Sequence, residues 1–241
     1  MRMKYVMQQK TKSILSTRPL EASLMEKAVE KGISIAVISF IETTPANNDS
    51  LKNAVEYWMQ QPATVVFTSM NAVESVNRYT GNQQPNWDIY SIGNTTRKLA
   101  EDFFGAPQVY GTADSAVALA DEIIKNKNEK PVVFFCGDQR RDELPGKLNE
   151  AGIPLTEVIT YHTIQTATKV SMQYDGILFF SPSAVHSFFS ANSIHPETVL
   201  FAIGNTTAEA LSQYSKNQII TGDKPGKENL LEKAIEFFSE L

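Results

Sequence analysis

Cysteine is nearly absent from this chain of 241 residues. Cys136 is the single one, so no disulfide can form within the chain and no cluster of cysteines can bind zinc. It ends the apolar stretch 131–136, and the sequence fixes neither His nor Asn beside it. We therefore interpret Cys136 as a small core residue rather than a nucleophile.

Long apolar runs and excess positive charge are missing too. No run reaches the ~18 apolar residues of a transmembrane helix, and the basic N-terminus is not followed by the apolar segment of ~7–15 residues that an export signal needs. We therefore expect a cytoplasmic protein without a membrane partner. The net charge of −5 and the pI near 5.3 lack the basic footprint of a nucleic-acid-binding protein, so we expect no nucleic acid as partner. Any anionic ligand has to be held by local geometry.

Motifs for phosphate and metal cofactors are also absent. The sequence contains neither G-x-G-x-x-G nor a Walker A motif, and the segment 222–227 has the wrong spacing and lacks Ser or Thr after its last lysine. The three histidines are scattered, without the spacing of metal ligands. The residues themselves therefore indicate no cofactor.

One pattern occurs twice. The strand-like run VVFTSMNAVES begins at Val65 and is followed by IYSIGNTT, while ILFFSPSAVHS begins at Ile177 and is followed by VLFAIGNTT. The two copies are offset by a nearly constant number of residues. The offset from Ser69 to Ser181 differs by only one residue from the offset between the two glycines, Gly93 and Gly204. This period is far longer than the roughly 20–50 residues of solenoid repeats, and it indicates two duplicated lobes.

Short β-branched stretches alternate with amphipathic segments along the whole chain. This alternation predicts parallel sheets covered by helices on both faces, and ten strands in two copies predict two five-stranded doubly wound lobes. We expect a helix that opens at Thr17-Arg18-Pro19 and a loop at 42–50. The expected strands are 13–16, 33–41, 64–67, 89–92, 108–110, 132–136, 155–160, 177–180, 199–203 and 218–221.

The sequence pattern permits two divisions into lobes. In a tandem division, the cut falls in the Lys/Asn/Glu-rich segment 125–130, which suits a linker. In the other, a middle lobe from about Asp49 to Thr156 is inserted into an outer lobe built from both ends of the chain, with crossings at 40–45 and 161–168. The pattern alone slightly favours the tandem division.

Polar residues follow the strands of both repeats. Ligands of open parallel sheets lie beyond the carboxyl ends of the strands, and there Ser69 and Ser181 are placed to cap helices, with Pro182 at a first helical position. Each Gly-Asn-Thr-Thr segment predicts a tight turn that ends in a capping hydroxyl. Helix N-termini of this kind suit carboxylates or phosphates, although α/β proteins also use such caps for structure alone.

Several motifs taken together point to a known family. They are Thr17-Arg18-Pro19, FTSMNAV at 67–73, Gly93-x-x-Thr96, Gly137 followed by Arg141-x-x-Leu144-Pro145, Tyr161-x-Thr163, FSPSAV at 180–185, and Ile203-Gly204-x-x-Thr207-Ala208. In their order and spacing the chain resembles the uroporphyrinogen-III synthase family from about Ser13 to Phe238. Met70, where a proline is common in the family motif, is a mild departure.

The resemblance implies an α/β fold of two doubly wound parallel-sheet (flavodoxin-like) lobes joined by a two-stranded β hinge. On this basis residues 1–40 and 167–241 form the outer lobe, 47–157 the inserted middle lobe, and 41–46 and 158–166 the hinge strands. The resemblance thus favours the inserted division over the tandem one.

The resemblance also implies a reaction. The family takes hydroxymethylbilane, a linear tetrapyrrole polycarboxylate, removes water and closes the ring with the last pyrrole inverted. The resemblance implies no metal or organic cofactor. Small lobes joined by a mobile hinge favour a monomer. Tyr161, on a hinge strand, is the expected general acid, with a packing role of its ring as the alternative. The residues expected to hold or attract the carboxylate arms are Arg18, Ser69, Asn71, Thr96, Arg141, Ser181, Ser183, Thr206 and Thr207.

Other functions remain open from the sequence. A non-catalytic two-lobed protein that binds small anions would use the same helix N-termini. An enzyme for phosphosugars or nucleotides and a regulatory member of the family are further alternatives.

Overall fold

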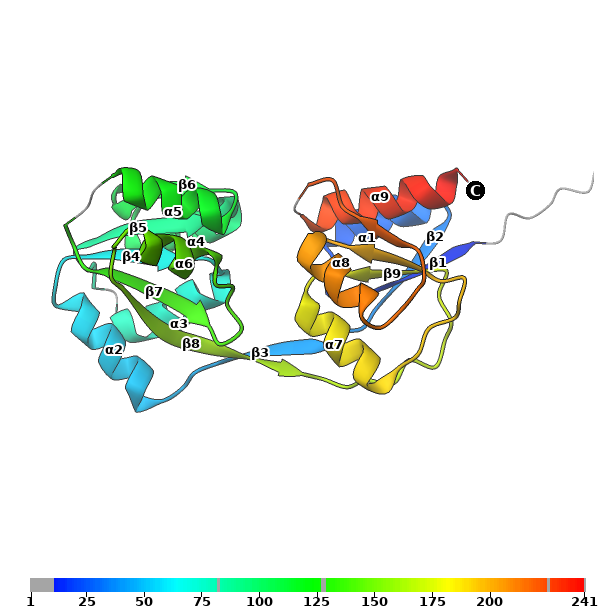
Figure 1. The fold of residues 1–241 in the computed structure, drawn as a ribbon, viewed down its shortest axis with the longest axis horizontal. Coiled ribbons are helices and arrows are strands. Elements are labelled where there is room, and N and C mark those ends of the chain that lie inside the picture. Colours follow the sequence, from blue (N-terminus) through cyan, green and yellow to red (C-terminus); the bar gives the residue numbers. More distant parts are fainter. Residues whose placement is uncertain (1–10, 82, 127–128, 225, 241) are drawn as a thin grey trace, which may run out of the picture. The chain divides into compact units, whose positions relative to one another are not determined.

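The structure is a computed structural model that describes residues 11–81, 83–126, 129–224 and 226–240. The chain divides into two compact units (Figure 1). Unit 1 contains the described residues of Met1–Glu42 and Gln165–Leu241, and unit 2 those of Thr43–Ile164. A tandem cut at 125–130 would fall inside unit 2. That the segments 41–46 and 158–166 act as a hinge stays a prediction.

Unit 1 is built on a five-stranded sheet in the order β11-β10-β9-β1-β2, with parallel pairing throughout. Numbered along the unit, this is the order 2-1-3-4-5 of a doubly wound sheet. Its elements are β1 (Lys12–Ser16), α1 (Ala22–Glu30), β2 (Ile33–Val37), β9 (Gly176–Phe179), α7 (Pro182–Ala191), β10 (Val199–Ala202), α8 (Asn205–Ser212), β11 (Ile219–Thr221) and α9 (Lys227–Ser239).

Alternate residues of these strands enter two separate cores. Ile14 and Leu178 face α1 and α9, while Leu15 and Phe179 face α7 and α8. Successive side chains of a strand point to opposite faces of a sheet, so the continuous apolar runs follow from burial on both sides.

Unit 2 contains a six-stranded sheet in the order β3-β8-β7-β4-β5-β6. The neighbours from β8 to β6 pair in parallel. Its elements are β3 (Ile41–Pro45), α2 (Asp49–Met59), β4 (Ala63–Phe67), α3 (Met70–Thr80), β5 (Trp87–Ile92), α4 (Gly93–Phe104), the short 3₁₀ helix η1 (Ala106–Gln108), β6 (Val109–Ala113), α5 (Ala116–Lys125), β7 (Val132–Gly137), α6 (Glu143–Glu150) and β8 (Leu155–Gln165).

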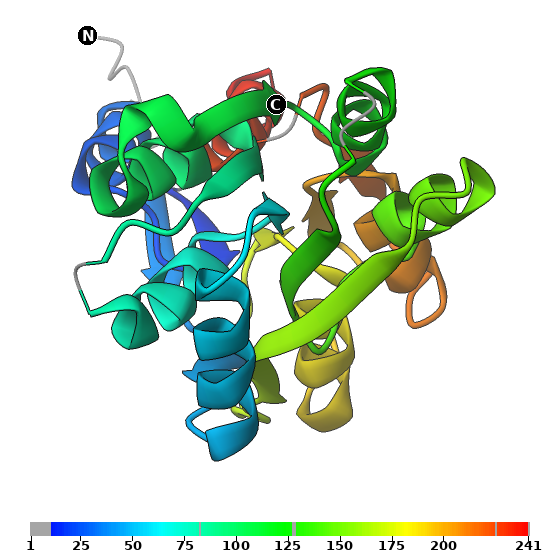
Figure 2. The same ribbon diagram turned by 90° about the vertical axis from the view of Figure 1, so that its left-hand side faces the viewer.

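The sheet of unit 2 is likewise covered on both faces. Phe67 and Phe135 stack at a ring separation of 5.8 Å in the core under α2, α3 and α4. Phe134 and Cys136 point the other way, into the core under α5 and α6. Figure 2 shows helices on both sides of this sheet. The expected fold class, α/β with parallel sheets in two lobes, is therefore confirmed. No helix within the described ranges is long and apolar enough to cross a membrane.

Several expected boundaries are wrong. The strand expected at 33–41 is two strands, because the chain leaves the sheet after Val37 and buries Phe40 completely against Phe188. β3 then occupies part of the expected loop 42–50, so the described segments contain eleven strands rather than ten.

Two further ends differ from the prediction. The first helix does not open at Thr17. The backbone N–H and hydroxyl of Thr17 both donate to the Leu178 carbonyl, at 3.1 and 2.8 Å, and this holds the chain extended beyond β1 until the helix begins at Ala22. In addition, the strand expected at 155–160 continues to Gln165 as β8.

Candidate active site

The sheet of unit 1 brings together the predicted residues of that unit. Its strands β1, β9 and β10 are adjacent and parallel, so the segments that follow them meet at one edge of the sheet. The switch point of a doubly wound sheet, where ligands bind, lies here between β1 and β9. The predicted residues that follow these strands are Arg18, Ser181, Ser183, Thr206 and Thr207.

The sheet of unit 2 does the same for a second group. Its strands β7, β4 and β5 are adjacent and parallel. Ser69 and Asn71 follow β4, Thr96 follows β5, and Arg141 follows β7. The chain adds β5 and β6 on one side of β4, and β7 and β8 on the other. The strand order therefore reverses between β4 and β7, which makes this the switch point of unit 2.

Both predicted serine caps are confirmed. Ser69 precedes α3, and its hydroxyl oxygen accepts a hydrogen bond of 3.2 Å from the backbone N–H of Asn71. The Ser181 oxygen accepts one of 3.2 Å from Ala184 at the start of α7, with Pro182 at the first helical position. A cap satisfies only some of the free N–H groups of a helix start, so others remain to bind an anion.

The predicted threonine caps are wrong. α4 begins at Gly93 and α8 at Asn205, and neither helix has a side-chain cap. Thr96 and Thr207 therefore lie within the first turns, where both are buried. The Thr207 hydroxyl is completely enclosed and has no hydrogen-bond partner among the described residues. Thr96 and Thr207 thus do not satisfy helix N–H groups as expected.

Tyr161 is held against the end of β7. It pairs with Gly137 in the parallel ladder, and its ring lies so close that a Cβ added to Gly137 would be 2.5 Å from Cζ and 2.8 Å from the hydroxyl oxygen. The backbone N–H of Asp138 donates to the Tyr161 carbonyl at 3.1 Å. The Asp138 carboxylate also contacts Nδ1 of His162, at 3.1 Å, and accepts from the N–H of Thr163. These contacts fix the backbone on both sides of Tyr161.

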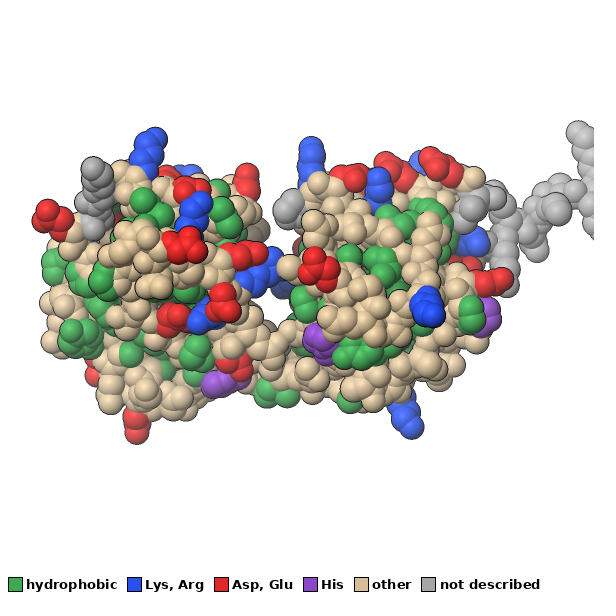
Figure 3. Space-filling model, viewed as in Figure 1, with side chains coloured by type: hydrophobic (Ala, Val, Ile, Leu, Met, Phe, Trp, Pro, Cys, Tyr) green, Lys and Arg blue, Asp and Glu red, His purple; other side chains and the backbone are tan. Residues whose placement is uncertain are grey.

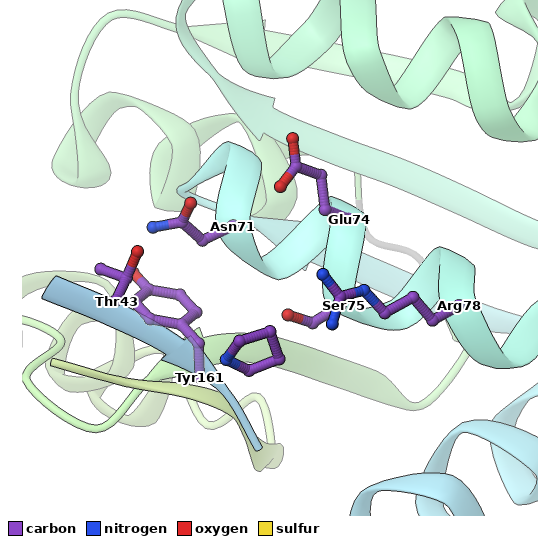
Figure 4. Close-up of a pocket in the computed structure, with 7 residues that line it drawn as sticks. Thr43, Asn71, Glu74, Ser75, Arg78 and Tyr161 are labelled. Atoms are coloured by element: carbon purple, nitrogen blue, oxygen red, sulfur yellow. The ribbon is translucent and has the colours of Figure 1, made fainter. Parts of the chain in front are cut away.

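A polar pocket of about 120 Å³ lies beside Tyr161, within unit 2 (Figure 4). It brings Tyr161 and Asn71 together, although they are far apart in the sequence. The sequence reasoning missed the other residues of its wall. These are Thr43, Pro45, Glu74, Ser75 and Arg78.

The two arginines predicted near the site are both exposed. Arg141 lies beside Arg140, whose guanidinium forms ion pairs with Glu157 and Asp142. Acidic and basic side chains are interspersed over the face of each unit seen in Figure 3. No broad positive surface is visible on that face, which agrees with local rather than bulk attraction of an anion.

Cys136 has the properties of a core residue. Burial raises the pKa of its thiol to about 12, so the reactive thiolate is scarce at neutral pH. Within the described ranges, no group of three or more His, Cys, Asp and Glu side chains could hold a metal ion.

The family of the chain follows from its sequence as a whole. The family model described as uroporphyrinogen-III synthase HemD matches residues 22–232. The chain belongs to the uroporphyrinogen-III synthase family. Uroporphyrinogen-III synthase from Saccharomyces cerevisiae is 24% identical over an aligned length of 221 residues, and the match covers 77% of this chain and 80% of the yeast protein.

Solved structures of the family share the fold. Uroporphyrinogen-III synthetase from Helicobacter pylori has a TM-score of 0.65 at 19% identity, over 94% of this chain and 99% of that one. A mutant uroporphyrinogen III synthase from Thermus thermophilus has a TM-score of 0.60 at 10% identity, over 94% and 98%. The resemblance expected from the motifs is confirmed. Members of the uroporphyrinogen-III synthase family are cyclising lyases of haem biosynthesis, and an anion-binding protein is not favoured.

Two of the missed pocket residues, Ser75 and Arg78, left a signal in the sequence together with the predicted Asn71. Asn71, Ser75 and Arg78 are spaced by four and three residues, which places them on one face of α3. In the structure this face lies opposite residues of β3 and β8. The spacing of the three residues does not show which strands lie there.

Proposed function

We propose that this chain is a uroporphyrinogen-III synthase, which dehydrates hydroxymethylbilane and closes it to uroporphyrinogen III with inversion of the last pyrrole ring. The match of the family model to residues 22–232 carries this proposal. The pocket at Tyr161 supports it, because it joins a phenol to polar groups at the carboxyl edge of a parallel sheet.

The chemistry suits a site with few acids and bases. The electron-rich pyrrole expels the terminal hydroxyl as water once a proton is supplied, leaving an azafulvene. The substituted carbon of the far ring then attacks and forms a spiro intermediate, which rearranges to the inverted product. Free substrate closes without inversion to the I isomer, so the protein has to orient the chain. Orientation can supply up to roughly 7–11 kcal/mol of a barrier.

Tyr161 is our candidate for the acid. Its phenol would donate a proton to the departing hydroxyl, directly or through a water molecule. The close packing on Gly137 and the hydrogen bond from Asp138 restrict its position, which favours a defined proton donor. A single general acid typically contributes ~10²–10⁴-fold to a rate.

The acetate and propionate arms would be held at the strand ends of each unit. Neutral helix starts with free N–H groups bind carboxylates without a large positive surface. The proposed ligands are those expected from the sequence with one exception, namely Arg18, Ser69, Asn71, Thr96, Arg141, Ser181, Ser183 and Thr206. Thr207 is not among them, because its hydroxyl is enclosed and its N–H donates to the Gly204 carbonyl. We also infer a monomer in the cytoplasm, and light scattering on the pure protein tests the oligomeric state.

The activity is tested by incubating pure protein with freshly generated hydroxymethylbilane and separating the product isomers. We expect mainly the III isomer, formed faster than in the blank. Formation of only the I isomer, at the rate of the blank, would refute the proposal. Stoichiometric capture of the bilane without turnover would favour the anion-binding alternative.

The role of Tyr161 is tested by Tyr161→Phe, which retains the ring and removes the hydroxyl. We expect kcat to fall at least tenfold, because the lost proton donor is worth ~10²–10⁴-fold. The far-ultraviolet circular dichroism should stay the same. An unchanged kcat would assign Tyr161 to packing alone.

A further inference from the structure

One face of α3 forms a polar wall opposite Tyr161. Asn71, Ser75 and Arg78 line the same pocket, at spacings that put them in one stripe along the helix. From Asn71 to Arg78 the stripe rises by seven residues, or about 10 Å of helix. It therefore joins the helix start at the strand ends to a positive charge two turns further along.

Arg78 is directed into this pocket. Side chains of an α-helix lean toward its N-terminus, so Arg78, in the last turn, reaches back toward Ser75, as Figure 4 shows. Among the described residues no carboxylate forms an ion pair with Arg78, whereas Arg97 is paired with Glu101 at 2.7 Å. The guanidinium of Arg78 is thus available to an external acid.

Glu74 is the one acidic residue of the pocket wall. It lies one turn before Arg78, and its carboxylate points away from Tyr161 in Figure 4. The inner part of the pocket therefore combines the Arg78 guanidinium with the neutral side chains of Asn71 and Ser75. This part of the pocket offers hydrogen-bond donors and a positive charge to a carboxylate.

The pocket has room for a carboxylate arm. Its volume of about 120 Å³ is well above the roughly 10–15 Å³ that a single water molecule needs. An acetate or propionate arm has only four or five non-hydrogen atoms, so the pocket can take one arm of a larger acid.

We propose that Arg78 binds one carboxylate arm of the linear tetrapyrrole and so determines which pyrrole ring lies next to Tyr161. The identity of the ligand rests on the proposed function, whereas the carboxylate site itself rests on the pocket. Arg78 is then a specificity-determining residue. Its guanidinium can take both oxygens of the arm at once, which a lysine ammonium does not reproduce.

Steady-state kinetics with hydroxymethylbilane test the role of Arg78. We expect Arg78→Gln to raise KM about tenfold. This is the lower end of the effect of losing a hydrogen bond to a charged group, and we choose it because Arg78 is exposed. Arg78→Lys should recover only part of this loss. Glu74→Gln should lower KM about twofold, because it removes a negative charge near the arm.

Lys125→Gln is the matched control. It removes one exposed positive charge of the same unit, at the C-terminal end of α5, and KM should not change. The role of Arg78 is overturned if Arg78→Gln leaves KM and the isomer ratio unchanged in a folded protein, or if Lys125→Gln raises KM equally.

A second measurement separates the site from the proposed function. Sodium propionate is titrated into ¹⁵N-labelled protein at constant ionic strength, while the Nε–H signal of Arg78 is followed. We expect a saturable shift in wild type and, in Arg78→Gln, loss of the accompanying shift at the Asn71 N–H. No saturable shift in wild type overturns the carboxylate site. A protein that shifts but does not cyclise the bilane retains the site and refutes only the proposed function.

Discussion

Replacing Gly137 by alanine tests whether the position of the Tyr161 ring matters to the reaction. Gly137 does not have one of the positive φ angles that favour glycine, so its backbone accepts alanine. The added methyl group would lie 2.5 Å from Cζ, 2.6 Å from Cε2 and 2.8 Å from the hydroxyl oxygen of Tyr161. The substitution therefore acts on the ring and not on the backbone.

The size of the effect follows from these distances. Non-bonded carbon atoms prefer a separation of about 3.5–4.0 Å, so the ring has to retreat by roughly 1 Å. A displacement of that size in a catalytic group can lower a rate about 10²-fold. Overpacking costs about 1–3 kcal/mol of stability. Tyr161 is only partly buried and can move outward, so we expect the lower end of that range.

The assay compares kcat for uroporphyrinogen III formation with the free energy of unfolding in urea. Gly111→Ala is the matched control in the same unit, because its methyl group would lie 2.6 Å from Cδ1 of Tyr90. Tyr90 is completely buried, so this variant should lose more stability than Gly137→Ala. Its kcat should stay near that of wild type.

The double variant Gly137→Ala/Tyr161→Phe completes the test. If alanine acts by misplacing the hydroxyl, it should lower kcat little further once the hydroxyl is gone. A role for the ring position is refuted if Gly137→Ala retains the kcat of wild type, or if alanine lowers kcat equally with and without the hydroxyl.

Two further predictions concern unit 1. Burial of the Asp175 carboxyl opposes its ionisation. The carboxylate accepts hydrogen bonds from the N–H and the hydroxyl of Ser13, at 2.8 and 2.9 Å. Together with the charge of Lys12, these bonds hold the pKa of Asp175 below its usual value. Its stabilisation is present above the unfolded pKa of about 4 and is lost as pH falls through the lowered pKa. Urea unfolding should therefore show a smaller loss of stability on acidification for Asp175→Asn than for wild type, and equal pH profiles would contradict this. Thr207→Val removes a buried hydroxyl without a described partner, so stability should stay equal or rise by about 1 kcal/mol. KM for hydroxymethylbilane should stay near that of wild type, because the enclosed hydroxyl does not reach the substrate. A rise of about threefold, the size expected for one lost hydrogen bond, would contradict this.

The features that the sequence determined by itself are local or repeated. Alternating strands and helices follow from the spacing of apolar residues, and parallel sheets follow from that alternation. The caps at Ser69 and Ser181 were predictable because a cap and the N–H it accepts from are at most three residues apart. The duplication and the order of the turn motifs span the chain, and they were sufficient to indicate the family.

Other features depended on contacts between distant segments. Thr96 and Thr207 lie inside helices rather than at caps because the helix starts differ by a few residues, which local preferences do not resolve. The break before Phe40 depends on the pocket that Phe188 offers it. At Phe40 a tertiary contact thus decided where an element ends.

The candidate site shows the same division. The sequence singled out Tyr161 and Asn71 separately, and the face of α3 that carries Arg78 was visible in its spacing. Only the tertiary structure placed that face opposite Tyr161, because β3 lies next to β8 through strand pairing across more than a hundred residues of chain. Pairing at such separations depends on the whole sheet, and no local pattern of residues encodes it.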